Sequence, residues 1–173
     1  IDTSNFRTLY AGSNTGGIFK TTDGGETWKS LADTIMTTGV LSIVADPRNQ
    51  NHMFIGTGHW GFGRSYGRGI LESNNGGATW EQTSLHSDIL PYNFIVKELW
   101  IHPSSPDTIL ALLNTEFNYK AYIFRSTDGA KSWQAVYSVD GAGLYSIKPD
   151  PLNQDIMPYD RIFEPVVMGN MLF

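Results

Sequence analysis

The sequence predicts an all-β fold built from short strands and turns. Eighteen of the 173 residues are glycine and eight are proline, a composition that suits frequent turns. Aromatic residues make up 13% of the chain, and no long apolar stripe follows helical spacing. A short turn motif also recurs three times at a nearly constant interval, which indicates one structural unit repeated along the chain.

The repeated motif has the pattern S/T-x-D/N-x-G/A-x-S/T-W. Its copies span residues 21–28, 73–80 and 126–133. The tryptophan of each copy follows the previous one by 52 residues (80 − 28) and then by 53 residues (133 − 80). This period is close to that of β-propeller blades. A second turn recurs at a similar interval. It contains Pro47, Pro103 or Pro151 and follows a short apolar stretch.

Together the two turns predict blades of four strands. The expected strands are 40–45, 52–57, 69–73 and 79–83 in one blade, and 96–101, 108–113, 121–126 and 132–137 in the next. Residues 1–32 would form a partial first blade, 38–84 the second, 95–138 the third, and 142–173 the divergent and apparently truncated start of a fourth. Propellers usually close with four to eight blades. We therefore interpret about three blades as part of a six- to eight-bladed propeller.

The residue types of the motif explain its turn. Glycine adopts positive φ without steric cost, Asp or Asn accepts hydrogen bonds from its own turn, and tryptophan can cover the turn. The structural residues are expected to be Asp23, Gly25, Trp28, Asn75, Gly77, Trp80, Asp128 and Trp133. Ala130 replaces the second glycine of the third copy. We expect Gly129, and not Ala130, to adopt positive φ there.

The three motifs resemble the Asp box, or bacterial neuraminidase repeat, and the resemblance covers about residues 5–150. This repeat occurs in sialidases, xyloglucan-degrading hydrolases, sortilin-type domains and the photosystem II assembly propeller. Residues 46–58 and 69–80 most resemble large secreted bacterial propeller proteins, many of them exported by the type IX pathway. The resemblance implies a protein that is secreted or held at the cell surface.

The strand order predicts where a binding site would lie. The Asp boxes join the third and fourth strands, so the loops between the second and third strands belong to the opposite face. Candidate binding residues in these loops and in the connection between blades are Trp60, Phe62, Arg64, Tyr66, Tyr92, Phe117 and Tyr119. Aromatic rings with polar neighbours can stack on sugars or anchor a protein partner. Alternatively, these rings pack down to close the loops over the blades.

Catalytic chemistry receives little support from the sequence. A glycoside hydrolase needs two carboxylates facing each other at roughly 5 to 9.5 Å, and Asp88 and Glu116, the two loop carboxylates that could serve, are each more typical of solvated surface charges. The chain has no cysteine, and its four histidines lack the spacing of metal ligands. We expect no cofactor, no metal and no catalytic residue.

Charge and hydropathy narrow the choice of partners. The net charge is −5 and the basic residues form no stripe, which disfavours nucleic acid. The apolar runs are too short for a membrane span. The sequence therefore favours a non-catalytic scaffold or a protein- or carbohydrate-binding module, whose partner is the rest of its own propeller, another protein chain or a glycan. The alternative is part of a xyloglucanase-like hydrolase whose catalytic carboxylates lie outside this chain.

Overall fold

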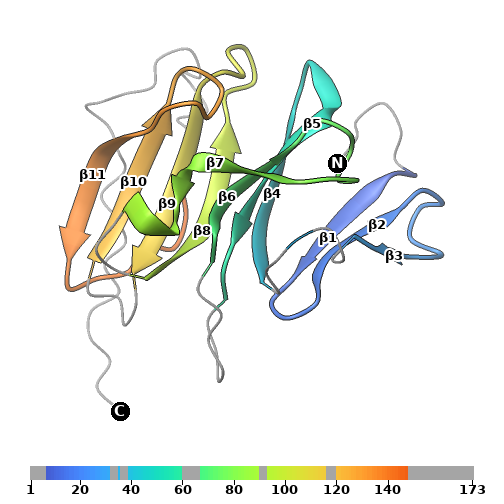
Figure 1. Cartoon of the computed structure of the whole chain (residues 1–173), viewed down its shortest axis with the longest axis horizontal. Coiled ribbons are helices and arrows are strands. Elements are labelled where there is room, and N and C mark those ends of the chain that lie inside the picture. The colour runs from blue at the N-terminus through green and yellow to red at the C-terminus, as the bar shows by residue number, and fades with distance from the viewer. Residues whose placement is uncertain are drawn as a thin grey trace.

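The computed structural model describes residues 7–31, 35, 39–59, 67–89, 93–115 and 120–147. They form three antiparallel sheets (Figure 1), so the predicted all-β class is confirmed. Sheet 1 contains β1 (Leu9–Ser13), β2 (Gly17–Thr21) and β3 (Lys29–Ser30). Sheet 2 contains β4 (Val40–Asp46), β5 (Asn49–Thr57), β6 (Gly69–Ser73) and β7 (Glu81–His86), and sheet 3 contains β8 (Phe94–Ile101), β9 (Ile109–Thr115), β10 (Lys120–Ser126) and β11 (Gln134–Asp140).

Within each sheet every strand pairs with its neighbour in the sequence, as expected for a propeller blade. The Asp boxes join the last two strands of all three sheets, and the proline turns join the first two strands of sheets 2 and 3. β7 and β11 begin at Glu81 and Gln134, two residues later than the sequence predicts. The delay arises because Thr79 and Ser132 are still hydrogen-bonded within their Asp boxes.

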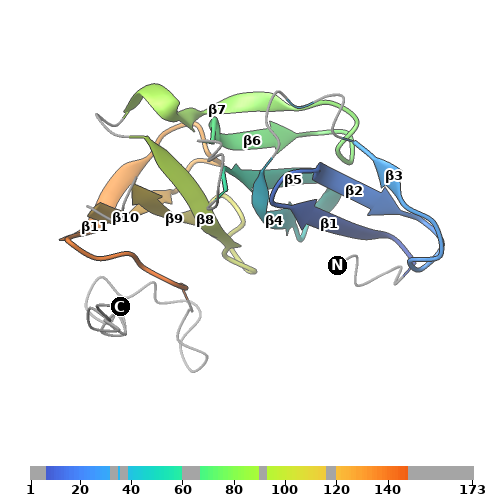
Figure 2. The ribbon, with the colours of Figure 1, turned by 90° about the horizontal axis from the view of Figure 1, so that it is seen from below.

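The first strands of sheets 2 and 3 lie at the junctions between blades. β8 packs against β4 and β5, and β4 packs against β1 (Figure 2). Two glycines permit this approach: a Cβ on Gly12 would come within 2.5 Å of the Val40 carbonyl oxygen, and one on Gly56 within 2.8 Å of the Val96 carbonyl oxygen. A side chain at either position would push the neighbouring blade away.

The hydrophobic core lies mainly between blades. Sheets 1 and 2 enclose a cluster of Ile18, Ile35, Val40, Ile55 and Leu71. Sheets 2 and 3 enclose a larger one that includes Phe54, Ile70, Leu85, Phe94, Val96, Leu99, Ile109, Ala111, Leu113 and Phe124. Each blade therefore depends on its neighbour for burial of its apolar faces, as in other repeat architectures.

Residues 142–147 repeat a contact made between sheets 2 and 3. The hydroxyl of Ser42 accepts the N–H of Leu99 at 2.9 Å, and the carboxylate of Glu98 accepts the N–H of Ile147 at 2.6 Å. Ser42 and Glu98 occupy the same position in their repeats. Ser42 lies four residues before Asp46 (46 − 42), and Glu98 lies four residues before His102 (102 − 98), the residues that precede the two turn prolines. Residues 142–147 thus contact sheet 3 as β8 contacts sheet 2. The wider assignment of 142–173 to a fourth blade stays a prediction, because residues 148–173 lie outside the described part of the chain.

The side chain of Asn114 anchors the same segment. Its amide donates to the Leu144 carbonyl at 2.9 Å, and its oxygen accepts the Leu144 N–H at 3.0 Å, so Asn114 substitutes for a neighbouring strand. Leu144 is buried against Leu112, Ala121 and Ile123. The backbone around residue 144 is thereby fixed on sheet 3.

Candidate functional site

Each Asp box closes its turn with the same set of hydrogen bonds. In box 1 (residues 21–28) the hydroxyl of Thr21 donates to Asp23 at 2.6 Å and accepts the N–H of Gly25 at 3.1 Å. Asp23 also accepts the N–H of Thr27 at 3.0 Å. The corresponding residues are Ser73, Asn75, Gly77 and Thr79 in box 2 (73–80), and Ser126, Asp128, Ala130 and Ser132 in box 3 (126–133). These hydroxyl, carboxylate or amide oxygens and these backbone N–H groups are therefore paired within the boxes themselves.

These hydrogen bonds favour the charged carboxylates. Hydrogen bonds from the side chains of Thr21 and Thr27 hold the pKa of Asp23 well below its usual range. Those from Ser132, followed by Ser126, lower the pKa of Asp128 to about 2. Asn75 keeps the acceptor oxygen, and its amide donates to the Thr79 hydroxyl at 2.8 Å. The box carboxylates therefore act as fixed acceptors and not as proton carriers.

The third Asp box contradicts one expectation from the sequence. Gly129 has a φ of 71°, as expected, but Ala130 also has positive φ, at 68°. Boxes 1 and 2 likewise contain two consecutive residues with positive φ, at Gly24 and Gly25 and at Gly76 and Gly77. The Ala130 N–H donates to Ser126 at 2.9 Å, so the turn's own hydrogen bond holds alanine in the strained conformation.

The tryptophans of the boxes differ in their surroundings. Trp80 packs against the cluster between sheets 1 and 2, and Trp133 against the cluster between sheets 2 and 3. Trp28 is 44% exposed, and its indole N–H donates to the Gly25 carbonyl at 3.2 Å. Boxes 2 and 3 therefore seal a junction with the preceding blade.

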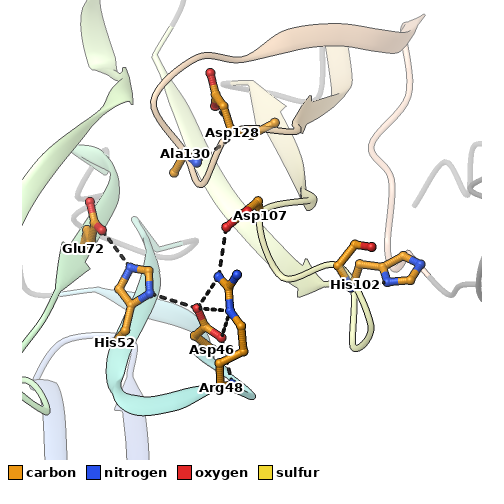
Figure 3. A network of polar contacts seen from close by, with 10 residues as sticks. Asp46, Arg48, His52, Glu72, His102, Asp107, Asp128 and Ala130 are labelled. Atoms are coloured by element: carbon orange, nitrogen blue, oxygen red, sulfur yellow. Dashed lines mark hydrogen bonds and ion pairs between the residues drawn. The ribbon is translucent and has the colours of Figure 1, made fainter.

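A charged network surrounds the first proline turn (Figure 3). Arg48 donates to Asp46 of its own turn at 2.7 Å and to Asp107 of sheet 3's turn at 2.9 Å. The two ring nitrogens of His52 contact Asp46 at 3.1 Å and Glu72 at 2.7 Å. Hydrogen bonds from Arg48 lower the pKa of the buried Asp46 to about 2. The network ties three strands of sheet 2 to the next blade.

Sequence reasoning missed this network, although a local signal pointed toward one part of it. The His52–Glu72 contact depends on the register of the structure, in which Phe54 pairs with Glu72 across β5 and β6, so that His52, two residues earlier, shares a face with Glu72. The local signal is the motif Asp-Pro-Arg, which places Arg48 two residues after Asp46. The contact with Asp107 depends on the packing of two blades and has no local signal.

In the second proline turn a histidine replaces the aspartate. His102 Nδ1 accepts the N–H groups of Ser104 at 3.2 Å and Ser105 at 3.0 Å. Asp46 accepts the N–H of Arg48 in the same way, at 2.8 Å. His102 therefore serves as a turn acceptor in the described structure, in the position that Asp46 occupies in the first proline turn.

The face opposite the Asp boxes carries the ends of the loops that join the second and third strands of sheets 2 and 3. The hydroxyl of Thr57 donates to the Gly69 carbonyl at 2.7 Å and accepts the Arg68 N–H at 2.8 Å. Thr115 likewise donates to the Lys120 carbonyl at 2.7 Å and accepts the Lys120 N–H at 2.8 Å. In each sheet, the threonine side chain thus connects the two ends of the loop by hydrogen bonds.

The aromatic binding candidates themselves lie outside the described residues. They are Trp60, Phe62, Arg64, Tyr66, Tyr92, Phe117 and Tyr119. Their role therefore stays a prediction. Of the two nominated carboxylates, Glu116 also lies outside the described ranges, and the side chain of Asp88 is 87% exposed at 3.7 Å from His86 Nδ1.

No group of three His, Cys, Asp or Glu side chains suited to a metal ion occurs within the described ranges. Within the same ranges no helix is long and apolar enough to cross a membrane.

Comparison with curated proteins identifies an enzyme relative. The chain is 30% identical over 151 residues to the xyloglucanase Xgh74A of Acetivibrio thermocellus. The alignment covers 82% of this chain and 18% of that protein. The chain therefore spans about a fifth of the length of the curated relatives that it matches.

Comparison with solved structures and family models gives the fold relatives. The structure of YCF48 bound to D1 peptide matches with a TM-score of 0.50 and 20% identity, over 80% of this chain and 40% of that one. A GH74 enzyme of Niastella koreensis matches with a TM-score of 0.46 and 18% identity, over 78% of this chain and 28% of that one. The family model described as "Sortilin, neurotensin receptor 3" matches residues 16–151. Because this match covers most of the chain, the protein belongs to the Sortilin-Vps10 family of Asp-box β-propellers.

Proposed function

We propose that these blades are a non-catalytic, carbohydrate-binding part of a larger propeller that is secreted or held at the cell surface. The observation that carries the proposal is the contrast between the two faces of the blades. The face of the Asp boxes and proline turns is closed by internal hydrogen bonds and ion pairs. On the opposite face, hydrogen bonds of Thr57 and Thr115 close the bases of two loops that are rich in aromatic residues, an eleven-residue loop (58–68) and a four-residue loop (116–119).

The carboxylates of the turn face support a structural role for that face. Asp23 and Asp128 accept hydrogen bonds within their boxes, and Asp46 is buried beside Arg48 and His52. Asp107 accepts a hydrogen bond from Arg48. A general acid or nucleophile must reach substrate, and these groups are committed to the fold.

Carbohydrate is the ligand class that the sequence and the relative favour together. The loop of residues 58–68 contains three aromatic rings and two arginines among glycines, a composition suited to stacking on sugars with polar contacts at their edges. The relative that is 30% identical is a xyloglucanase. We therefore propose xyloglucan, or a similar β-glucan, as the ligand.

The second candidate function is hydrolysis by the whole protein. The 30% identity to the xyloglucanase Xgh74A favours it. In this case the catalytic pair would lie on other blades of the propeller, outside this chain, and the blades described above would hold the substrate.

One pair of assays separates the proposals. The full-length protein is titrated with xyloglucan oligosaccharides by calorimetry, and polymeric xyloglucan is assayed for new reducing ends. Binding without cleavage supports the non-catalytic role, and binding with cleavage supports the hydrolase. If the protein binds neither xyloglucan nor cello-oligosaccharides, the carbohydrate proposal is wrong.

A further inference from the structure

The first strands of sheets 2 and 3 carry a bulge at the same position. The register of β4 with β5 shifts between Val40 and Ser42, and that of β8 with β9 shifts between Val96 and Glu98. Leu41 and Lys97 are therefore the extra residues of two equivalent bulges. Such bulges redirect a side chain away from the regular alternation of a strand. Counted back from the proline turns, the corresponding residue of the next repeat is Tyr145.

Lys97 and Tyr145 touch across the junction. The Nζ atom of Lys97 lies over the Tyr145 ring, 4.1 Å from its centroid, which is the geometry of a cation–π contact. Partial burial lowers the pKa of Lys97. The contact covers one face of the ring and holds its orientation.

Tyr145 is exposed on a backbone that is fixed on both sides. Tyr145 as a whole is 67% exposed to solvent. The preceding Leu144 is buried and bonded twice to Asn114, and the N–H of Ile147 donates to Glu98. A large ring held in this way has lost most of its conformational freedom before any ligand binds, so little further entropy is lost in binding.

We propose that Tyr145, oriented by Lys97, is a stacking platform for a pyranose ring of a glycan chain. This inference rests on the proposed carbohydrate ligand and adds a defined contact point to it. The sugar stacks on the ring face that Lys97 leaves open, and the polar edge of the sugar stays in water. Lys97 acts as a positioning residue, since it touches the ring and not the sugar.

Trp28 is a natural control for this site. Among the described residues, Trp28 is the other exposed aromatic residue, at 44%. Its indole N–H is bonded to Gly25 within an Asp box, on the turn face. If exposure of a ring alone were sufficient for sugar binding, Trp28 and Tyr145 would contribute alike.

The test is calorimetric titration of the full-length protein and its variants with a xyloglucan oligosaccharide. Tyr145→Ala should weaken binding about tenfold, the loss expected for one aromatic stacking contact. Tyr145→Phe and Trp28→Ala should bind as the unmodified chain does. Lys97→Met should weaken binding about threefold, and Lys97→Arg should restore it, because arginine also packs on aromatic faces.

A second measurement does not depend on the folding of a variant. In the unmodified chain, nuclear Overhauser effects should connect the Tyr145 ring protons with sugar protons. If the chain binds the oligosaccharide but Tyr145→Ala binds equally well, or these effects are missing, the Tyr145 site is wrong while the carbohydrate function stands. If the unmodified full-length protein binds neither xyloglucan nor cello-oligosaccharides, both are wrong.

Discussion

The carboxylate of Glu98 accepts the backbone N–H of Ile147 at 2.6 Å, in the position where Ser42 accepts the N–H of Leu99 one blade earlier. A side-chain oxygen in the first strand of a sheet thus accepts a backbone N–H of the next repeat at two successive junctions. Since hydrogen bonds to charged groups contribute about 1.5–3 kcal/mol, Glu98→Ala should accelerate exchange of the Ile147 amide at least about tenfold.

Hydrogen–deuterium exchange measured by NMR checks this expectation. Ser42→Ala is the matched control, because it should accelerate exchange at Leu99 and leave Ile147 unchanged. Equal exchange at Ile147 in Glu98→Ala and the unmodified chain would show that Glu98 does not hold this segment.

The three box tryptophans should differ in their contribution to stability. Trp80 and Trp133 pack into the clusters between blades, so truncation to alanine should cost about 3–5 kcal/mol. Trp28 is 44% exposed, and its truncation should cost less than about 1.5 kcal/mol. Urea unfolding of the three variants provides the comparison, and equal losses would contradict the proposed sealing of junctions by boxes 2 and 3.

Gly77 and Ala130 occupy the same position in boxes 2 and 3, but exchanging glycine and alanine should affect the stability of the two boxes differently. A Cβ on Gly77 would lie 2.9 Å from Leu31 Cδ1 and 3.3 Å from Trp80 Cζ2, and φ is 85°. Gly77→Ala should therefore destabilise the chain by about 1–3 kcal/mol.

The reverse change in box 3 should be nearly neutral. Ala130→Gly relieves about 1–2 kcal/mol of backbone strain, but it loses a buried methyl group worth about 0.8 kcal/mol and about 0.5–1 kcal/mol of chain entropy. Thermal unfolding should place Ala130→Gly within about 1 kcal/mol of the unmodified chain by the same balance. A large gain in stability would show that the strain at Ala130 is underestimated.

Acid should destabilise the turn face. The pKa values of Asp46 and Asp128 are lowered from 3.8 to about 2, mainly by hydrogen bonds from Arg48 and Ser132 respectively. Their stabilisation is complete above the unfolded value near 3.8 and is lost as pH falls through about 2. Unfolding free energy should therefore decrease between pH 4 and pH 2 (approximate limits set by these values).

The variant Asp128→Asn tests the origin of this slope. Asn75 already replaces aspartate in box 2 and keeps the turn hydrogen bonds, so the variant should fold. Its stability should depend less steeply on pH in the acid range, as measured by urea unfolding at several pH values. An unchanged slope would exclude Asp128 as a contributor.

Local sequence was sufficient for the blade pattern and insufficient for the junctions. The Asp boxes were predictable because residues such as Asp23 and Thr27 satisfy each other within one turn. Strand order followed from the alternation of two turn types. The Arg48–Asp107 pair depends on how two blades pack, which no local motif encodes.

Two further features required the structure for different reasons. Steric preference alone does not predict positive φ at Ala130, because the hydrogen bond from its N–H to Ser126, which outweighs that preference, forms only in the folded turn. The exposed ring of Tyr145 emerges only when the bulge at Lys97 and the anchor at Asn114 are seen together. Of the aromatic candidates in the loops, none lies within the described residues.

The central claim is that ligand binds on the loop face and the adjoining first strands, and that the turn face is structural. Mapping of backbone amide chemical shifts during titration with a xyloglucan oligosaccharide tests it most directly. The largest changes are expected at loop-face and first-strand residues, namely Thr57, Arg68, His86, Lys97, Thr115, Lys120 and Tyr145. Largest changes at the Asp boxes, around Gly25, Gly76 and Asp128, would contradict this claim.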